Sequence, residues 1–298
     1  MARMVSGLAE VDGGELAWGS AGEGPGVVFL HPGLWDSRVW DEQFGVFSRT
    51  YHVLRYDLRG YGRSSRPEPG KAYSHVDDLA AVMDAAGLDR ATLIGNSLGG
   101  RVSIDFGLTY PERLTALVLA ATNVGGFEGT QEEAGAYADL DREIEQALEA
   151  GDAERAMELE LSVWAMGLGT DDPAGVRIRR IAFDNLHVIT MDESGAVELD
   201  GAFRRLPEID APTLVLPADH DPPVFRRLSE ELAARIPNAR LVGILGTDHV
   251  IPVRRPAEFN RVGPGVPRRG ALMLRADVLL LRVFLRLLRG GDDLVREV

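Results

Sequence analysis

The chain has 298 residues, with 46 acidic and 32 basic side chains, and a formal charge of −14. This balance argues against a nucleic-acid partner, because a phosphate backbone selects a basic surface, and it favours a small-molecule substrate. The chain has no cysteine, which excludes disulfides, thiolate zinc sites and a cysteine nucleophile. Residues 1–14 lack the apolar run of a secretory signal, so we expect a cytoplasmic protein.

From residue 5 to about 122, short apolar runs alternate with amphipathic stretches. This pattern is typical of strands buried on both faces of a mostly parallel sheet and joined by crossover helices. Strands are predicted at Gly26–Leu30, His52–Tyr56, Ala91–Ile94 and Ala116–Ala121, and helices at Val39–Phe47, His75–Ala86 and Leu98–Leu108. The alternation returns near residue 208, with strands predicted at Thr213–Leu216 and Arg240–Ile244 and a helix at Phe225–Ile236.

Residues 123–207 interrupt this rhythm. Gln131–Ala150 and Ala153–Met166 have helix-forming composition, with apolar residues at helical spacing. We therefore predict a helical cap inserted into an α/β core formed by residues 1–122 and 208–262.

Residues 263–298 begin with a hinge rich in glycine and proline and continue as a cationic amphipathic helix, Leu272–Leu288. A terminal helix packed on the domain is favoured over a helix lying on a membrane surface. Arginines within the helix argue against a membrane span. The segment could also be a displaced final helix, an appended anchor or the product of a shifted reading frame.

The strongest local motif is Gly95-Asn96-Ser97-Leu98-Gly99, which fits the pattern G-x-S-x-G. It lies between the predicted strand Ala91–Ile94 and a predicted helix that opens at Leu98. In this context the motif indicates a sharp strand-to-helix turn that presents a nucleophilic serine hydroxyl, and the flanking glycines provide the space that the turn requires. Ser97 is therefore the predicted nucleophile.

A serine hydroxyl needs a base to take its proton and a third group to orient that base. In the fold that carries this turn, the acid and then the histidine follow the serine in the chain. His249 directly follows the last apolar strand and is the predicted base. Asp219 and Asp221 both follow the strand Thr213–Leu216, and Asp221 is favoured because it immediately precedes a turn containing proline.

The oxyanion that develops during acyl transfer needs two backbone donors. One is the N–H of Leu98, directly after the nucleophile, and the other comes from the loop after an earlier strand. Pro32 has no N–H to donate, so Gly33 is the predicted second donor, with Leu34 as the alternative.

Taken together, these motifs resemble the α/β-hydrolase family, in particular its bacterial cofactor-free serine esterases and lactonases. The resemblance runs from about residue 10 to 262 and includes His31-Pro32-Gly33, Tyr56–Ser64, the turn at Ser97, Pro212–Pro222 and Gly246–Asn260. The Tyr56–Ser64 segment is a fold marker, in which Asp57 is interpreted as structural. Two departures are His31-Pro32, where the family usually has His-Gly, and Gly263-Pro264-Gly265, where it expects a final helix.

The resemblance implies an α/β-hydrolase fold and a serine hydrolase that cleaves a carboxylic ester or lactone through an acyl-enzyme on Ser97. It implies no metal, nucleotide or flavin cofactor, and nothing in the sequence fixes the oligomeric state. We expect a small, mainly apolar substrate in a pocket between sheet and cap. The predicted lining is Leu34, Trp35, Trp40, Phe127, Trp164, Met166 and Val250.

Three alternatives remain open. The first is a keto-acid carbon–carbon bond hydrolase or an enol-lactonase. The elbow Gly95-Asn96-Ser97 resembles that of the carbon–carbon hydrolases, but their glycine-rich oxyanion loop is absent, and the twelve acids and two arginines of Glu128–Glu160 disfavour anionic substrates. The second is a non-catalytic member of the fold that binds a ligand, and the third is cofactor-free peroxidase or acyl-transfer chemistry.

Overall fold

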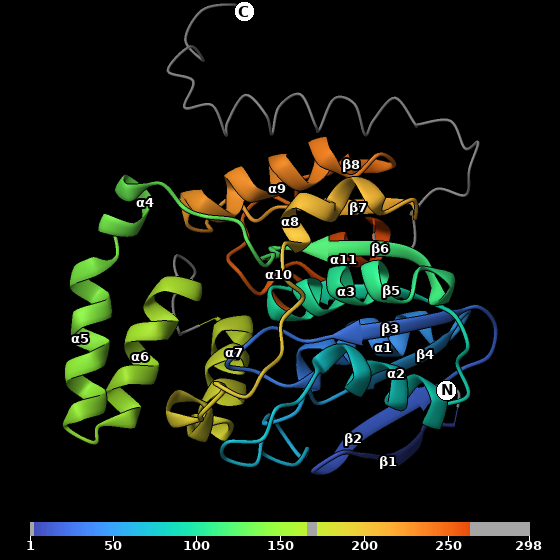
Figure 1. The fold of residues 1–298 in the computed structure, drawn as a ribbon, viewed down its shortest axis with the longest axis horizontal. Coiled ribbons are helices and arrows are strands. Elements are labelled where there is room, and N and C mark those ends of the chain that lie inside the picture. The colour runs from blue at the N-terminus through green and yellow to red at the C-terminus, as the bar shows by residue number, and fades with distance from the viewer. Residues whose placement is uncertain (1–2, 166–171, 263–298) are drawn as a thin grey trace, which may run out of the picture.

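The structure, a computed structural model, describes residues 3–165 and 172–262. Within these residues eight strands form one sheet in the order β1-β2-β4-β3-β5-β6-β7-β8 (Figure 1). The strands are β1 (Val5–Val11), β2 (Gly14–Ala21), β3 (Gly26–Leu30), β4 (His52–Tyr56), β5 (Ala91–Asn96), β6 (Leu114–Ala120), β7 (Thr213–Leu216) and β8 (Ala239–Leu241). β2 pairs antiparallel with β1 and β4, and every pairing from β4 to β8 is parallel. The parallel strands therefore end at one common edge.

Helices cover both faces of the sheet. One face packs against α2 (His75–Ala85), α3 (Leu98–Thr109) and α9 (Pro223–Arg235), and the other against α1 (Asp41–Phe47) and α11 (Pro256–Val262). Along β3, Val28 and Leu30 pack on the face that α2, α3 and α9 cover, and Val27 and Phe29 pack on the face that α1 and α11 cover. This alternation explains why the strand is a continuous apolar run, because both of its faces are buried.

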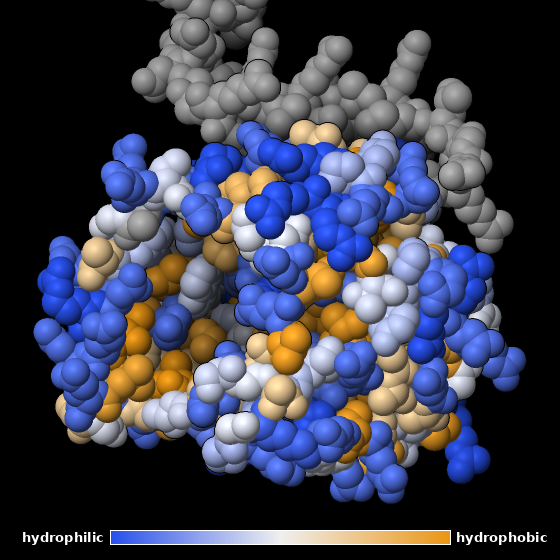
Figure 2. All heavy atoms as spheres, viewed as in Figure 1, coloured by the Kyte–Doolittle hydropathy of each residue, from blue (hydrophilic) through white to orange (hydrophobic). Residues whose placement is uncertain are grey.

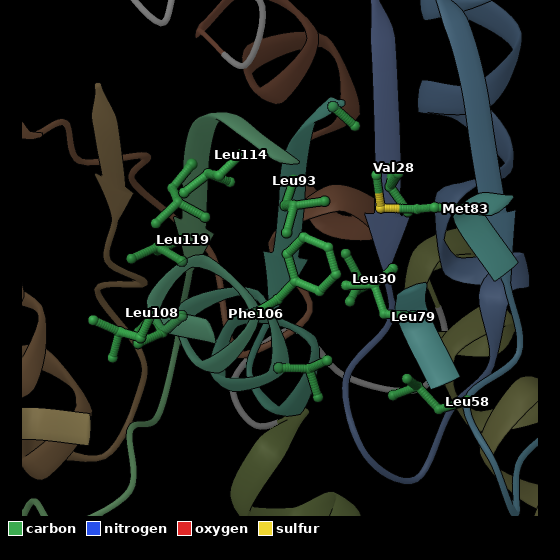
Figure 3. Close-up of a cluster of buried hydrophobic side chains, with 14 of the residues drawn as sticks. Val28, Leu30, Leu58, Leu79, Met83, Leu93, Phe106, Leu108, Leu114 and Leu119 are labelled. Carbon is green, nitrogen blue, oxygen red and sulfur yellow. The ribbon is translucent and has the colours of Figure 1, made fainter. Parts of the chain in front are cut away.

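Apolar packing on the face covered by α2, α3 and α9 fixes α3 against the centre of the sheet. Figure 3 shows the ring of Phe106, on α3, directed toward Leu93 of β5 and Leu30 of β3, and all three side chains are fully buried. Burying such side chains contributes about 1.5–3 kcal/mol each. The packing holds the start of α3, and therefore the turn at Ser97, at the end of β5.

Between β6 and β7 the chain forms a mainly helical segment beside the carboxyl edge of the sheet (Figure 1). Its helices are α4 (Gln131–Gly135), α5 (Ala138–Glu149), α6 (Ala153–Trp164), α7 (Pro173–Asp184) and α8 (Ala202–Arg205). α5 and α6 pack as an antiparallel pair joined by a short turn at Gly151, which has a φ of +73°. None of the described helices has the length and apolarity needed to cross a bilayer.

The predicted α/β fold is confirmed, and most predicted elements lie within a few residues of the observed ones. Two differences have local causes. The predicted helix Gln131–Ala150 is divided into α4 and α5, with Gly135 ending α4. The hairpin of β1 and β2 was not predicted, although Asp12-Gly13 forms its two-residue turn. Met166 and the helix Leu272–Leu288 lie outside the described residues.

A buried carboxyl group lies inside the α3 layer. Asp105 is 6% exposed, and its Oδ1 has no hydrogen-bond partner among the described residues. Burial raises the pKa of this carboxyl from 3.8 to about 6, and the charge of Arg101 and a backbone hydrogen bond from Leu199 only partly oppose that shift. The ionised carboxylate is therefore disfavoured in the folded state.

This carboxyl predicts a pH-dependent loss of stability. The pKa of Asp105 is higher in the folded state than in the unfolded state. The contribution of its protonated carboxyl to the free energy of unfolding is therefore fully present below about pH 4 and is lost as pH rises through about 6. Asparagine cannot ionise, so the free energy of unfolding of Asp105→Asn should increase relative to that of wild type by about 1–3 kcal/mol as pH rises from 4 to 8. Urea unfolding at both pH values measures this gain, and a difference that does not change with pH would contradict it.

Candidate active site

Ser97 occupies the sharp turn between β5 and α3. Its φ of 52° is unusual for a non-glycine residue, and its N–H donates to the carbonyl of Ala120 on β6 at 2.9 Å. A Cβ on Gly95 would overlap the carbonyl oxygen of Gly99, and one on Gly99 would overlap that of Leu30. The two glycines of the motif are therefore required because backbones approach each other closely on both sides of the serine.

Such strain recurs along this edge of the sheet. Besides Ser97, the non-glycine residues with positive φ in the described chain are Leu34, at 66°, and Ala121, at 43°. Leu34 follows β3, and Ala121 directly follows β6. The three residues thus lie just beyond β3, β5 and β6, which are neighbours in the sheet. Strained backbone of this kind clusters at functional sites.

His249 and Asp221 meet beyond the ends of β7 and β8. The His249 Nδ1 lies 2.9 Å from the Asp221 Oδ1, and the two residues are 3% and 5% exposed. A carboxylate only accepts hydrogen bonds, so the Nδ1–H donates and the Nε2 of the neutral ring carries the free lone pair. Asp221 Oδ2 has no partner among the described residues. This pair can orient an imidazole and stabilise its protonated form.

Asn96 connects the serine turn to the histidine loop. Its Nδ2 donates to the carbonyl of His249 at 3.0 Å and to that of Ala120 at 3.1 Å. The residue that precedes Ser97 is thus bonded to the backbone of His249, which brings the two loops together. Within the described chain, no hydrogen bond joins the Ser97 hydroxyl to the His249 ring. Catalytic hydrogen bonds of this kind often form only when substrate is bound.

The second candidate acid, Asp219, has a different role. Its two carboxylate oxygens accept hydrogen bonds from the N–H groups of Gly246 and Thr247, each at 2.9 Å. Asp219 thus supports the loop that carries His249. The structure brings Asp221, and not Asp219, to the imidazole.

Two aromatic rings enclose His249. The ring centroid of Trp164, at the end of α6, lies 4.7 Å from that of His249, and the centroid of Phe225, on α9, lies 5.0 Å away. The Trp164 carbonyl also accepts the His249 N–H at 3.2 Å. Phe225 was not predicted to lie at the site, although it comes four residues after Asp221 at the start of the predicted helix.

The predicted oxyanion donors lie on two loops at the same edge. The Leu98 N–H is the first of α3, so it has no acceptor within the helix. The buried His31 ring accepts the N–H of Leu58 at its Nε2 and therefore donates from Nδ1 to the Pro32 carbonyl at 2.8 Å. Burial also lowers the pKa of His31, which favours this neutral form. Because the N–H and C=O of one trans peptide point in opposite directions, the Gly33 N–H is directed away from His31.

The predicted pocket residues differ in their exposure. Leu34 and Trp164 are half-buried, so both have surface that a small molecule could contact. Trp35 and Val250 are at most 1% exposed, and the Trp35 Nε1 donates to the carbonyl of Ile178 on α7 at 2.9 Å. A pocket role for these two side chains requires their neighbours to move. Of the other predicted residues, Trp40 is fully buried, the Phe127 ring packs against Phe203, and Met166 lies outside the described residues.

A surface cavity of about 490 Å³ lies elsewhere on the molecule, beside Trp18 on β2 and Arg55 on β4. Its three arginines are all paired with carboxylates, Arg38 with Asp36, Arg55 with Asp41 and Arg63 with Asp57. Neither Ser97 nor His249 lines it. The cavity therefore offers no unpaired cation, and its lining carries no part of the chemistry described above.

The sequence model of the Alpha/beta hydrolase family matches residues 27–262. This match covers most of the chain and agrees with the fold, so the protein belongs to the alpha/beta hydrolase family and is an enzyme of that class.

Three similar proteins illustrate the range of the family. The chain is 30% identical over 248 residues to a Caulobacter segnis protein provisionally named carbamate hydrolase RutD, covering 78% of this chain and 88% of that protein. It is 37% identical over 115 residues to the 2-hydroxy-6-oxo-2,4-heptadienoate hydrolase of Pseudomonas putida, covering 37% of this chain and 41% of that protein. The solved structure of Est816, described as an N-acyl homoserine lactone degrading enzyme, is 30% identical with a TM-score of 0.70, covering 87% of this chain and 99% of that one.

The turn at Ser97 predicts that Gly95→Ala will unfold or strongly destabilise the protein. The added methyl group would overlap the backbone of Gly99 and Gly100, which cannot move without displacing α3, so we expect a loss of at least about 3 kcal/mol. Gly45→Ala on α1 is the matched control, because its Cβ would meet nothing within 4 Å and the variant should be about 0.5–1 kcal/mol more stable. Urea unfolding of both variants measures these changes, and equal effects would refute the steric argument.

Proposed function

We propose that the protein is a serine hydrolase that cleaves a carboxylic ester or lactone of a small, mainly apolar substrate through an acyl-enzyme on Ser97. One observation carries this proposal. A serine on a strained turn is connected through Asn96 to a histidine whose Nδ1 is paired with a buried aspartate. A purely structural turn needs neither the buried Asp221–His249 pair nor a strained serine beside it.

In the proposed mechanism the Ser97 hydroxyl attacks the substrate carbonyl while the His249 Nε2 accepts its proton. Asp221 keeps the proton on Nδ1 and stabilises the imidazolium that forms. The amides of Leu98 and Gly33 hold the oxyanion, and His249 then gives its proton to the leaving alkoxide. A water molecule, deprotonated by His249, hydrolyses the acyl-enzyme and restores the free serine.

The proposal includes residues 123–207 as a cap over the core formed by residues 1–122 and 208–262. Contact of Trp164, on α6, with His249 supports it. The surface is hollowed between the α5–α6 pair and the rest of the molecule, and hydrophobic colouring is visible within the hollow (Figure 2). A hollow with apolar walls favours an apolar acyl or alcohol group, and the acidic residues of α5 and α6 disfavour an anionic one.

A keto-acid hydrolase is the second candidate. Similarity to the Pseudomonas putida enzyme supports it, since the substrate in that enzyme's name is a hydroxy-oxo-dienoate. Similarity to Est816 supports a lactone instead. A neutral ester or lactone fits the acidic helical segment better than a dienoate does, because like charges repel.

Labelling and a substrate panel test the proposal together. A fluorophosphonate should form one adduct, at Ser97, in wild-type protein and none in Ser97→Ala, as detected by mass spectrometry of the intact and digested chain. Neutral p-nitrophenyl esters and N-acyl homoserine lactones should be hydrolysed faster than carboxylate-bearing dienoates. Absence of an adduct in folded protein would favour a ligand-binding role, and turnover of dienoates alone would favour the keto-acid hydrolase.

The roles of the two aspartates predict unequal effects of one substitution. Asp221→Asn should lower kcat by about 1,000- to 10,000-fold, because an asparagine cannot hold the proton on Nδ1 or stabilise the imidazolium. Asp219→Asn retains one acceptor oxygen for the loop and should lower kcat by less than about 10-fold. Steady-state kinetics with one p-nitrophenyl ester measure both values, and equal losses would contradict the assignment of Asp221 as the acid.

A further inference from the structure

A buried ion pair lies directly behind the catalytic histidine loop. Asp248, the residue before His249, has a side chain that is 1% exposed, and the side chain of Arg254 is 2% exposed. Arg254 belongs to the short helix α10 (Ile251–Arg254), and its Nε donates to the Asp248 Oδ2 at 2.7 Å. The other oxygen, Oδ1, accepts the N–H of Val250 at 3.3 Å. The Asp248 carboxylate, which precedes His249, thus bonds to two residues that follow it in the chain.

The same guanidinium reaches two helices of the inserted segment. Its Nη1 donates to the Asp172 Oδ2 at 2.9 Å, and its Nη2 donates to the carbonyl of Ala165 at 3.3 Å. Asp172 is the N-cap of α7 and Ala165 is the C-cap of α6. A planar guanidinium with fixed donors is suited to this task, because it can hold three acceptors in one geometry.

This arrangement is poorly explained as a source of stability. Burial raises the pKa of Asp248, and the charge of Arg254 only partly opposes that rise. Buried ion pairs commonly contribute little net stability, since the desolvation of both charges offsets their attraction. What such a pair does supply is a defined geometry, here between the His249 loop and helices α6 and α7.

We propose that Arg254 is a positioning residue, which fixes the His249 loop relative to α6 and α7 and thereby sets the imidazole over Ser97. The inference rests on the proposed serine mechanism. Trp164, at the end of α6, also touches the His249 ring and accepts its backbone N–H, so a shift of α6 reaches the imidazole directly. The inserted segment therefore acts on proton transfer as well as on access to the site.

Asp172→Asn tests the proposal with the least disturbance. An asparagine still caps α7 by accepting from Ala174 and Gly175, and the Arg254–Asp248 pair stays intact, but the charged contact with Arg254 is lost. Asp152→Asn is the matched control, because Asp152 is the N-cap of α6 through its bond from Arg155. Both variants exchange the same charge at the N-terminus of a helix in the same segment.

We expect Asp172→Asn to lower kcat and the rate of fluorophosphonate labelling by about 10-fold with KM unchanged within about 2-fold, since small misplacement of a catalytic group is costly. Asp152→Asn should match wild type. Each rate is divided by the fraction of protein whose Ser97 is labelled at the end of the reaction, which removes the contribution of unfolded protein. Arg254→Lys keeps the charge but cannot reach three acceptors. Its kcat and labelling rate should therefore lie between those of wild type and Arg254→Met.

The outcomes separate the two proposals. If wild type is not labelled at Ser97, the serine mechanism fails and the role of Arg254 fails with it. If wild type is labelled and Asp172→Asn behaves like Asp152→Asn, the serine mechanism stands and the positioning role is overturned. A loss that disappears after correction for the labelled fraction also overturns it, because the residue would then affect folding alone.

Discussion

The two hydrogen bonds donated by the amide of Asn96 are the interaction on which the site depends. They join the end of β5 to β6 and to the backbone of His249, a residue 153 positions later in the chain. Both bonds are buried, so neither competes with water. The serine turn, the central sheet and the histidine loop are therefore held in one frame, within which Asp219 and Asp221 set the shape of the loop and the orientation of the ring.

Around this frame the site is built from strand ends. β3, β5, β7 and β8 are parallel, so the loops that follow them emerge at the same edge and bring distant residues together. The inserted segment then approaches from outside that edge and places the ring of Trp164 beside that of His249. Rigid strands thus set the positions of Ser97, Asp221 and His249, and the helices set their surroundings.

Much of this arrangement could be predicted from the sequence because it follows from local rules. β3, β4 and β7 match their predicted ranges, since apolar runs bounded by polar residues and turns define strands buried on both faces. The serine motif and the order of acid and histidine then selected Ser97, Asp221 and His249 as candidates, and the structure pairs the last two. Phe225, Asn96 and Arg254 could not be assigned roles, because their contacts depend on how loops pack in three dimensions. The β1–β2 hairpin was missed because glycines and partial exposure weaken its alternation.

The three non-glycine residues with positive φ carry a thermodynamic consequence. Leu34, Ser97 and Ala121 each hold an unfavourable backbone conformation, at a cost of about 1–3 kcal/mol apiece. Summed over the three residues, the cost is about 3–9 kcal/mol, which is comparable to the margin of about 5–15 kcal/mol by which a domain is stable. The apolar layers on both sides of the sheet must supply the free energy that offsets this strain. Backbone strain at the carboxyl edge of the sheet, the rim, therefore limits how much destabilisation by core mutations the protein can tolerate. Selection for greater robustness would therefore act first against the geometry of that rim.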